Sequence, residues 1–225
     1  MLILAFDTAT SAITAAVHDG AVLLAERHII DTRRHAEALA PTIAAVLADA
    51  QAELRDITHI GVGIGPGPFT GLRIGVVTAV TFGHALSVPV LGICSLDAIA
   101  HAAAAGVTAE FLVASDARRK EIYWARYTSI AGRAERLSPP SVGRPMALDA
   151  RDQALPCAGR GPLLYPEFLP HPIGPQDVSA ACVAELTVRE VRAGRHPEPA
   201  PLYLRRPDAQ EPGAPRPTLV AGAGS

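Results

Sequence analysis

The segment from Phe69 to Leu86 constrains the fold most, because it is a candidate helix without a polar face. It follows the loop Gly65–Pro68 within the run GPGPFTGLRIG, and Arg73 is its only charged residue. A helix on the surface of a single soluble domain normally has one polar face. A helix that is apolar on all sides must be buried by neighbours on two sides. We expect the second neighbour to be another protein.

Small residues recur every four positions along this segment, which makes a stripe where another backbone can come close. The stripe weakens the helix itself, so a closely packed neighbour must offset that cost. In the simpler interpretation the stripe lies on the protein's own sheet, which leaves the opposite side uncovered. The stripe is Gly71, Gly75, Ala79 and Gly83; Leu72, Val76 and Val80 are expected to fill the core beside it, and Ile74, Val77 and Thr81 lie opposite.

The composition indicates a globular protein without a strong charge. The 225 residues are 49% hydrophobic, enough for one large domain or two small lobes. A formal net charge of -2 gives no general attraction for nucleic acid phosphates. Three widely spaced cysteines fit no zinc or CxxC spacing, and there is no signal sequence or uninterrupted apolar run of about 18 residues. We expect a soluble, cytoplasmic protein without a membrane segment.

Hydrophobic patterns predict two sheets joined by helices. The first sheet begins as a three-strand antiparallel meander, and later strands alternate with helices and add in parallel. The expected strands are 2–6, 12–18, 21–30, 58–64 and 89–93, and the expected helices are 33–50, 69–86 and 95–105. A second sheet is expected at 111–115, 122–127 and 133–137, followed by a helix at 178–193. No element is predicted in the proline-rich region 138–176.

This order is that of a ribonuclease H-like lobe used twice, the α/β architecture of the ASKHA proteins actin, Hsp70 and sugar kinases. We expect an N-terminal lobe at 1–105, a smaller C-terminal lobe at 106–206 and a disordered tail at 207–225. The helix at 178–193 is expected to pack back on the N-terminal lobe. In ASKHA enzymes the first hairpin turn carries an aspartate that orients a metal-bound water. Asp7, Thr8 and Thr10 occupy that place and form a candidate vestigial site for nucleotide or phosphate.

Other candidate sites have simpler interpretations. Pro66 and Pro68 have no N–H, so the loop before the apolar helix is a tight turn rather than a phosphate cradle. No two of the eight histidines lie three or four residues apart, so no HxxxH metal pair exists, and GxSxG is absent. The basic turn DARRKE beside aromatic residues suggests RNA contact, but a solvated hairpin is the favoured interpretation because Asp116 and Glu121 dilute its charge.

Six segments, in order over most of the chain, resemble the TsaB family, also called YeaZ. They are ILAFDTAT at 3–10, RRHAEALAP at 33–41, GPGPFTGLRIG at 65–75, SLDAIA at 95–100, DARRKEIYWARY at 116–127 and PLYLR at 201–205. TsaB is the dimerisation subunit of the bacterial complex that makes threonylcarbamoyladenosine beside the tRNA anticodon. The resemblance implies a scaffold without catalytic residues, which pairs with TsaD, the related protein that performs the transfer.

The resemblance also offers an explanation for the absence of an HxxxH metal pair. TsaD-like sequences carry a histidine pair that would fall here near Ser95 and Ile99, which cannot form a metal site. The chain is therefore expected to be a paralogue without the metal. Pro68 stands where the family usually has serine, which further weakens any assignment of nucleotide binding to this loop.

In the family, the pairing surface is formed largely by the first two helices of the N-terminal lobe. This implies an interface on 33–50 and 69–86, where an apolar helix suits association. The implied ligands are ATP or ADP at the junction with the partner, and the implied further partners are the ATPase subunit TsaE and, without TsaD, a second copy of the chain. The candidate interface residues are His35, Leu39, Ile43, Gly71, Arg73, Ile74, Val77 and Thr81.

Two alternatives stay open on the sequence alone. An ATPase or small-molecule kinase of the same fold would use Asp7 with Thr8 and Thr10, although no second acid or base can be nominated. A metalloprotease-like paralogue is suggested by the wider superfamily, but the sequence lacks its ligands. Contact with tRNA is left undecided.

Overall fold

The first sheet joins the N-terminal meander to two parallel strands. The structure, a computed structural model, describes residues 1–30 and 35–205. The strands are β1 (Ile3–Asp7), β2 (Ala12–His18), β3 (Leu23–Ile30), β4 (His59–Gly63) and β5 (Val90–Ile93), in the order β3-β2-β1-β4-β5. β1, β2 and β3 pair antiparallel, whereas β4 and β5 add in parallel beside β1, as the sequence predicted.

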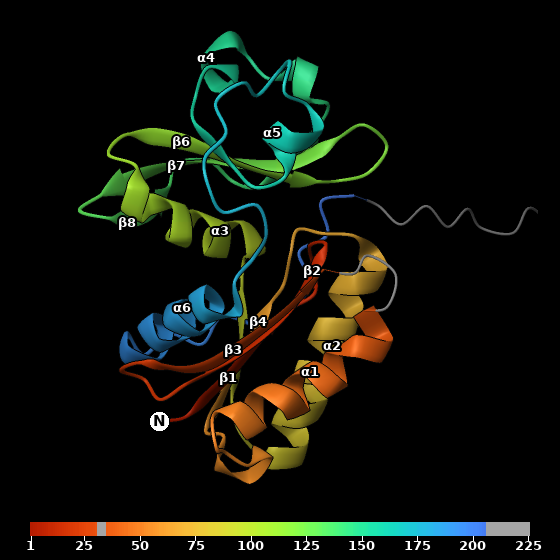
Figure 1. Cartoon of the computed structure of the whole chain (residues 1–225), viewed down its shortest axis with the longest axis vertical. Helices are drawn as coiled ribbons and strands as arrows, with labels where there is room; N and C mark the ends of the chain where they lie inside the picture. Colours follow the sequence, from red (N-terminus) through yellow and green to blue (C-terminus); the bar gives the residue numbers. More distant parts are fainter. Residues whose placement is uncertain (31–34, 206–225) are drawn as a thin grey trace, which may run out of the picture.

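Helices cover both faces of this sheet (Figure 1). α1 (His35–Asp49) packs on β2 and β3, and α2 (Phe69–Leu86) packs beside it on β4. α6 (Ala180–Arg192) covers the opposite face and lies mainly against β1 and β2. Coverage on both faces explains why every residue of β1 and β2 is buried.

A second, smaller sheet follows in sequence. It contains β6 (Glu110–Asp116), β7 (Ile122–Ile130), β8 (Arg133–Arg136) and β10 (Cys157–Ala158), in the order β10-β6-β7-β8, and β9 (Ser141–Gly143) also pairs with β7. The helices are α3 (Ser95–Ala103), α4 (Ala150–Gln153) and α5 (Gly161–Leu164), with short 3-10 turns at Leu54–Asp56, Ala104–Gly106 and Pro145–Ala147. The mixed α/β class with two sheets is confirmed.

One hydrophobic core continues from the first sheet into the second. It combines Ile3 of β1, Ile99 of α3, Phe111 of β6, Tyr127 of β7 and Val183 of α6. The Phe111 and Tyr127 rings stack with centroids 5.7 Å apart. The Tyr127 hydroxyl donates a 2.8 Å hydrogen bond to Asp97 in α3. The two sheets are therefore packed against a common interior.

The small-residue stripe of α2 packs against the protein's own residues, at the turn after β1 and on β5. A Cβ added at Gly71 would lie 2.4 Å from the Thr8 carbonyl oxygen, and one at Gly83 would lie 2.2 Å from Val90 Cγ2. The simpler interpretation of the stripe is therefore confirmed. By length and composition alone α2 could span a membrane, yet 33% of it is buried in the fold, along the stripe and beside it.

Several details differ from the sequence predictions. α1 continues through the exposed Pro41, although proline inside a helix usually kinks or ends it. Val80 is 46% exposed and does not fill the core beside the stripe. The region 138–176 contains short elements, namely β9, α4, β10 and α5, which are too short to leave a periodic pattern. Residues 33 and 34, placed in the first helix, and the tail 207–225 lie outside the described residues.

The two edges of the first sheet differ. At β5, the amide of Gly92 donates to the Pro197 carbonyl at 2.9 Å, and Leu202 N donates to Ile64 O at 2.8 Å. The chain after α6 thus covers this side of the sheet. β3 forms the other edge, and all of its residues except Ala25 are exposed.

Candidate functional site

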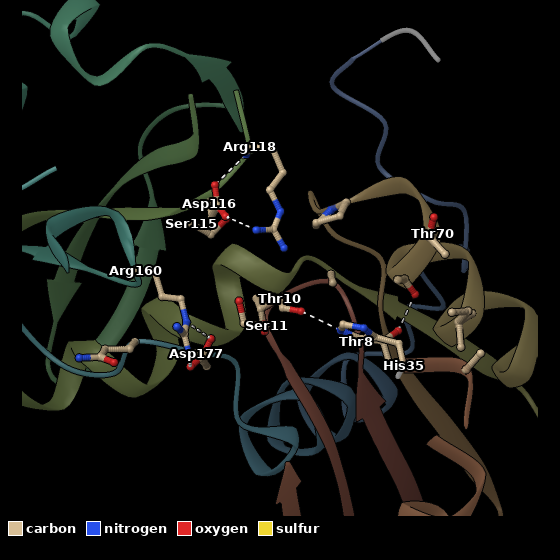
Figure 2. Close-up of a pocket in the computed structure, with 16 residues that line it drawn as sticks. Thr8, Thr10, Ser11, His35, Thr70, Ser115, Asp116, Arg118, Arg160 and Asp177 are labelled. Carbon is tan, nitrogen blue, oxygen red and sulfur yellow. Dashed lines mark hydrogen bonds and ion pairs between the residues drawn. The ribbon is translucent and has the colours of Figure 1, made fainter. Parts of the chain in front are cut away.

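A cavity of about 300 Å³ lies where the turn after β1, the start of α2 and the second sheet meet. Hydroxyl side chains and two Arg–Asp pairs face it (Figure 2). Pro68 of the loop before α2 lines this cavity, and in the same loop the Gly67 carbonyl accepts a 3.4 Å hydrogen bond from the Tyr123 hydroxyl. The candidate nucleotide residues at the end of β1 lie beside or beneath this cavity.

Asp7 is fully buried, and both oxygens of its carboxylate accept hydrogen bonds from other groups of the protein. Oδ1 accepts a 2.7 Å hydrogen bond from the Ala9 amide, and Oδ2 accepts a 2.5 Å bond from the Ser95 hydroxyl. Burial raises the pKa of Asp7, and the hydrogen bond from Ser95 partly offsets that rise. The Ser95 hydroxyl thus fastens the start of α3 to the β1 turn.

The Thr8 side chain also makes an internal contact. Its hydroxyl donates a 2.7 Å hydrogen bond to the Gly71 carbonyl in the first turn of α2. A Cβ at Gly75 would lie 2.5 Å from this hydroxyl oxygen, so only glycine leaves room for it. Thr10 lines the cavity, and its carbonyl oxygen lies 3.1 Å from His35 Nε2. The predicted residues thus come together, but mainly to join β1, α2 and α1.

Glycine in the GPGP loop permits a close approach of the β1 turn. A Cβ at Gly67 would lie 2.2 Å from the Ala9 carbonyl oxygen, and one at Gly63 would overlap the Asp7 carboxylate. The expected role of the loop as a tight strand-to-helix turn agrees with this packing. Its glycines accommodate neighbouring atoms of the protein.

The charged side of the cavity was missed by sequence reasoning. Arg160 forms two 2.7 Å bonds to the Asp177 carboxylate, and Arg118 Nη1 lies 3.2 Å from Asp116 Oδ2 (Figure 2). Arg160 lies in the region for which no structure was predicted, and its partner is 17 positions away. No local sequence signal links the two. Each arginine faces the cavity already paired with a carboxylate.

Several charged side chains of the DARRKE turn form ion pairs within the protein. Arg118, Arg119 and Lys120 all have positive φ, between 53° and 62°, which is unfavourable for residues with a side chain. Arg118 pairs with Asp116, and Glu121 pairs with Arg205 from the C-terminal segment. The local structure agrees with the hairpin interpretation and with an ordered turn.

The outward side of α2 is apolar and exposed. Val77 is 62% exposed and Val80 46%, although each lies in the middle of the helix. Near the start of the helix, the Arg73 guanidinium lies 3.7 Å above the Phe69 ring, and its Nε donates to the Tyr203 hydroxyl at 3.1 Å. Tyr203 comes from the C-terminal segment, so sequence spacing could not place it here.

The structure corrects part of the candidate interface. Leu39 and Ile43 are only 2% and 3% exposed and belong to the core beneath α1, and Gly71 is buried against Thr8. These three residues do not reach the surface. His35 and Ile74 are half-buried and line the cavity. Of the candidates, Arg73, Val77 and Thr81 are exposed, although the Thr81 hydroxyl donates to the Val77 carbonyl.

Metal ligands are not clustered in the part of the chain that the structure describes. No group of three or more His, Cys, Asp or Glu side chains is placed to hold an ion among residues 1–30 and 35–205. At the position of the TsaD-like histidine pair, Ser95 bonds to Asp7 and Ile99 is buried in the core. Cys94 and Cys157 are buried thiols, and burial raises the pKa of Cys94 to about 12.

Comparison with known proteins identifies relatives over most of the chain. A family model described as TsaD, tRNA N6-adenosine threonylcarbamoyltransferase, matches residues 25–210. An uncharacterised protein of Mycobacterium tuberculosis (strain H37Rv) is 44% identical over 92% of this chain and 93% of its own length. A 41% identical, uncharacterised protein of Mycobacterium leprae aligns with 98% of this chain, which spans 59% of that relative's length.

Relatives whose names state a role are more distant. The tRNA threonylcarbamoyladenosine biosynthesis protein TsaB of Escherichia coli is 36% identical over 56% of this chain and 55% of its own length. Among solved structures, YeaZ from Pseudomonas aeruginosa matches 90% of this chain and 99% of its own, with 29% identity and a TM-score of 0.78. The expected ASKHA-type fold is confirmed.

Proposed function

The chain belongs to the TsaB (YeaZ) family, and we propose that it is a non-catalytic subunit in the formation of threonylcarbamoyladenosine in tRNA. In this proposal it binds a TsaD-like paralogue, and that partner transfers the threonylcarbamoyl group to the adenosine beside the anticodon. The relatives named TsaB are biosynthesis proteins for this modified nucleoside, which supports the pathway.

The apolar outward face of α2 is the observation that carries the partner assignment. Phe69, Val77 and Val80 are 39%, 62% and 46% exposed, so apolar surface faces solvent along much of one helix. Burial of such a surface is the main driving force for association, and contiguous apolar patches on soluble proteins mark interaction sites. We propose that these side chains contact the TsaD-like partner, together with Arg73, which lies between Phe69 and Val77 on the same side of the helix.

The interior contacts of Asp7 support a non-catalytic role. An ASKHA ATPase or kinase would need this carboxylate to orient a metal-bound water, but both of its oxygens already accept hydrogen bonds from Ala9 N and Ser95 Oγ. A metalloprotease-like activity would need clustered ligands, and none lie together among residues 1–30 and 35–205. Neither alternative is favoured by an observation on the described residues.

The cavity is poorly suited to hold a nucleotide by itself. Arg118 and Arg160 are neutralised by Asp116 and Asp177, and Asp7 is turned inward. A phosphate entering there would meet arginines whose charges are already paired with the Asp116 and Asp177 carboxylates. We therefore place ATP or ADP, if used, at the junction with the partner, where a TsaE-like ATPase would also join. A cytoplasmic location follows from this role.

A size measurement with the partner tests the proposal. The chain and a TsaD-like protein should co-elute at micromolar concentration, and Val77→Glu should raise the dissociation constant at least tenfold, because it buries a charge in the apolar patch. Leu163→Glu is the matched control, since Leu163 is 59% exposed on α5, in the other lobe. Equal affinity of the wild-type protein and Val77→Glu would refute the interface.

Reconstitution of the modification tests the role itself. The partner proteins, ATP and an unmodified tRNA should give threonylcarbamoyladenosine with this chain and little or none without it. Asp7→Asn should retain activity in this assay, because we assign Asp7 a structural role. If the product forms equally well without this chain, the proposed requirement is wrong.

A further inference from the structure

Arg73 is held in one position on the outward face of α2. Its guanidinium lies 3.7 Å above the Phe69 ring, and its Nε donates a 3.1 Å hydrogen bond to the Tyr203 hydroxyl. The Phe69 and Tyr203 rings also contact each other, with centroids 5.2 Å apart. These three side chains, which we call the Arg73 clamp, come from the first two turns of α2 and from the C-terminal segment that passes beside them (Figure 1).

The clamp leaves the outer end of the guanidinium without a partner. In the part of the chain that the structure describes, no carboxylate pairs with Arg73 and its Nη groups make no hydrogen bond. Arg136 and Arg160, by contrast, each bind a carboxylate of the same chain. An arginine that is already held loses less rotamer freedom when it binds a further group.

We propose that Arg73 binds a carboxylate of the TsaD-like partner through its two Nη groups, and that Tyr203 is a positioning residue for this contact. The inference rests on the proposed function and adds the chemistry of the group that the partner presents. Two N–H donors of a guanidinium match the two oxygens of a carboxylate, and such bidentate pairs are specific in geometry. The Tyr203 hydroxyl accepts from Nε, so its own proton can be donated to the same carboxylate.

The apolar surroundings of Arg73 require an acidic group on the covering surface. Phe69 and Val77 lie one turn before and one turn after Arg73, and they are 39% and 62% exposed. A partner that covers these side chains also removes water from around the guanidinium. Loss of water strengthens an ion pair and makes an unpaired arginine costly. The surface that covers the patch must therefore place a negative charge opposite Arg73.

A nucleic acid phosphate fits this position less well than a protein carboxylate. Arg73 is the only charged residue in Phe69–Leu86, and the net charge of the chain is -2. Binding to an RNA backbone needs several basic side chains on one surface. A single arginine beside aromatic residues in an apolar patch is typical of a protein interface, where these residue types contribute much of the binding free energy.

Binding measured at two salt concentrations tests the contact. Arg73→Met should raise the dissociation constant of the complex with a TsaD-like protein about tenfold, and that constant should depend less on salt than the wild-type value does. Arg133→Met is the matched control, because it removes the same charge from an exposed site on β8 in the other lobe. Unchanged affinity and salt dependence in Arg73→Met, with Val77→Glu still weakening the complex, would overturn this inference alone. A wild-type chain that binds no partner would overturn both proposals.

A carbodiimide cross-link identifies the acidic group of the partner. Such a reagent joins an amine directly to a carboxylate in contact with it, and Lys120 is the only lysine of the chain. The double variant Lys120→Arg with Arg73→Lys therefore has its single lysine at the proposed contact, and mass spectrometry should find position 73 joined to one Asp or Glu of the partner. Lys120→Arg with Leu163→Lys is the control and should give no such product. No product at position 73, or an effect of Arg73→Met that appears only when tRNA is present, would contradict a partner carboxylate.

A double-mutant cycle tests the role of Tyr203. Tyr203→Phe keeps the ring beside Phe69 but removes the hydroxyl, and it should raise the dissociation constant about threefold. In the Arg73→Met background the same change should have no further effect, because the hydroxyl holds the guanidinium and faces the same carboxylate. Equal effects in the two backgrounds would show that Tyr203 acts independently of Arg73 and would overturn its positioning role.

Discussion

Position 71 requires glycine because the backbone of Thr8 lies against it. The nearest atom to an added Cβ is the Thr8 carbonyl oxygen at 2.4 Å, and Thr8 is a buried residue directly after β1. The same glycine offers its own carbonyl to the Thr8 hydroxyl. The requirement for glycine therefore comes from the junction of two elements.

Gly71→Ala should lower the free energy of unfolding by about 1–2 kcal/mol, because overpacking outweighs the better helix propensity of alanine. Urea denaturation measures the change. Gly106→Ala is the control, because nothing lies within 4 Å of its added Cβ and the change should stay within about 0.5 kcal/mol. Similar values for both variants would contradict the close contact.

The contribution of Asp7 to the free energy of unfolding decreases as the pH rises, which is opposite to the usual behaviour of a carboxylate. Its pKa is raised above 3.8, so between that value and the folded-state pKa the native protein binds more protons than the unfolded chain. This contribution favours folding at low pH and is lost as the pH rises. Relative to the wild-type protein, Asp7→Asn should therefore gain stability as the pH increases from about 4.

Asp19 provides an internal control of opposite sign. In the β2–β3 turn its carboxylate accepts 2.7 Å hydrogen bonds from Ala21 N and Val22 N, which lower its pKa. Relative to the wild-type protein, Asp19→Asn should lose stability as the pH rises toward about 4, between the lowered folded-state pKa and the unfolded value, and should change little above that. Thermal melts of the three proteins from about pH 2 to 7 compare the trends, and parallel curves for both variants would refute the assignment.

The sequence located the turn at Asp7, Thr8 and Thr10 but could not orient its side chains. The local pattern of a strand followed by small polar residues is enough to predict a turn. The Asp7 partner Ser95 lies 88 positions away and the Thr8 partner Gly71 lies 63 positions away. Such contacts depend on the packing of whole elements, which no local pattern contains.

The N-terminus of α6 is held by its cap residue Ser179 and by Glu26 of β3. The Ser179 hydroxyl accepts from Cys182 N at 3.4 Å and donates to Glu26 Oε1 at 2.8 Å. The same glutamate oxygen accepts from Ala181 N at 3.2 Å. The cap therefore also attaches the helix to β3 of the first sheet.

Ser179→Ala should destabilise the fold by about 1 kcal/mol, since it removes the cap and leaves helix amides without a partner. Chemical denaturation gives the value. Ser141→Ala serves as control, because the Ser141 hydroxyl contacts only the Pro139 carbonyl at an exposed site. A loss as large in Ser141→Ala as in Ser179→Ala would argue against the capping contribution.

Long elements were predicted well because their apolar pattern is strong. The bounds of α2 agree with the predicted 69–86, since glycine and proline precede it and Ser87 ends it in a left-handed conformation. The direction of its faces was predicted only in part: Val80 was placed in the core and is exposed. For α1, Leu39 and Ile43 were assigned to a partner but face the sheet. An apolar residue fits either a core or an interface, so composition alone cannot separate them.

Tyr127 links the two sheets through a buried polar contact. Its hydroxyl bonds to Asp97 of α3, and Arg136 of β8 lies 3.2 Å from the same carboxylate oxygen. Burial and the nearby Asp97 carboxylate raise the pKa of Tyr127 well above 10, so the hydroxyl remains a donor at neutral pH.

Tyr127→Phe should lower the free energy of unfolding by about 1.5–3 kcal/mol, because a hydrogen bond to the half-buried Asp97 carboxylate is lost while the ring remains stacked on Phe111. Denaturation followed by fluorescence and circular dichroism should still show one transition. Tyr165→Phe is the control, since the Tyr165 hydroxyl makes no hydrogen bond within the described residues, and an equal loss there would refute the link.

The common interior of the two sheets has a mechanical consequence. A hinge between lobes requires an interface that can part cheaply, and here parting would expose Phe111, Tyr127 and the inner side of α6 to water. The chain should therefore behave as a rigid body and present α2 in one orientation. A partner that meets an already ordered surface loses little free energy to rearrangement on binding.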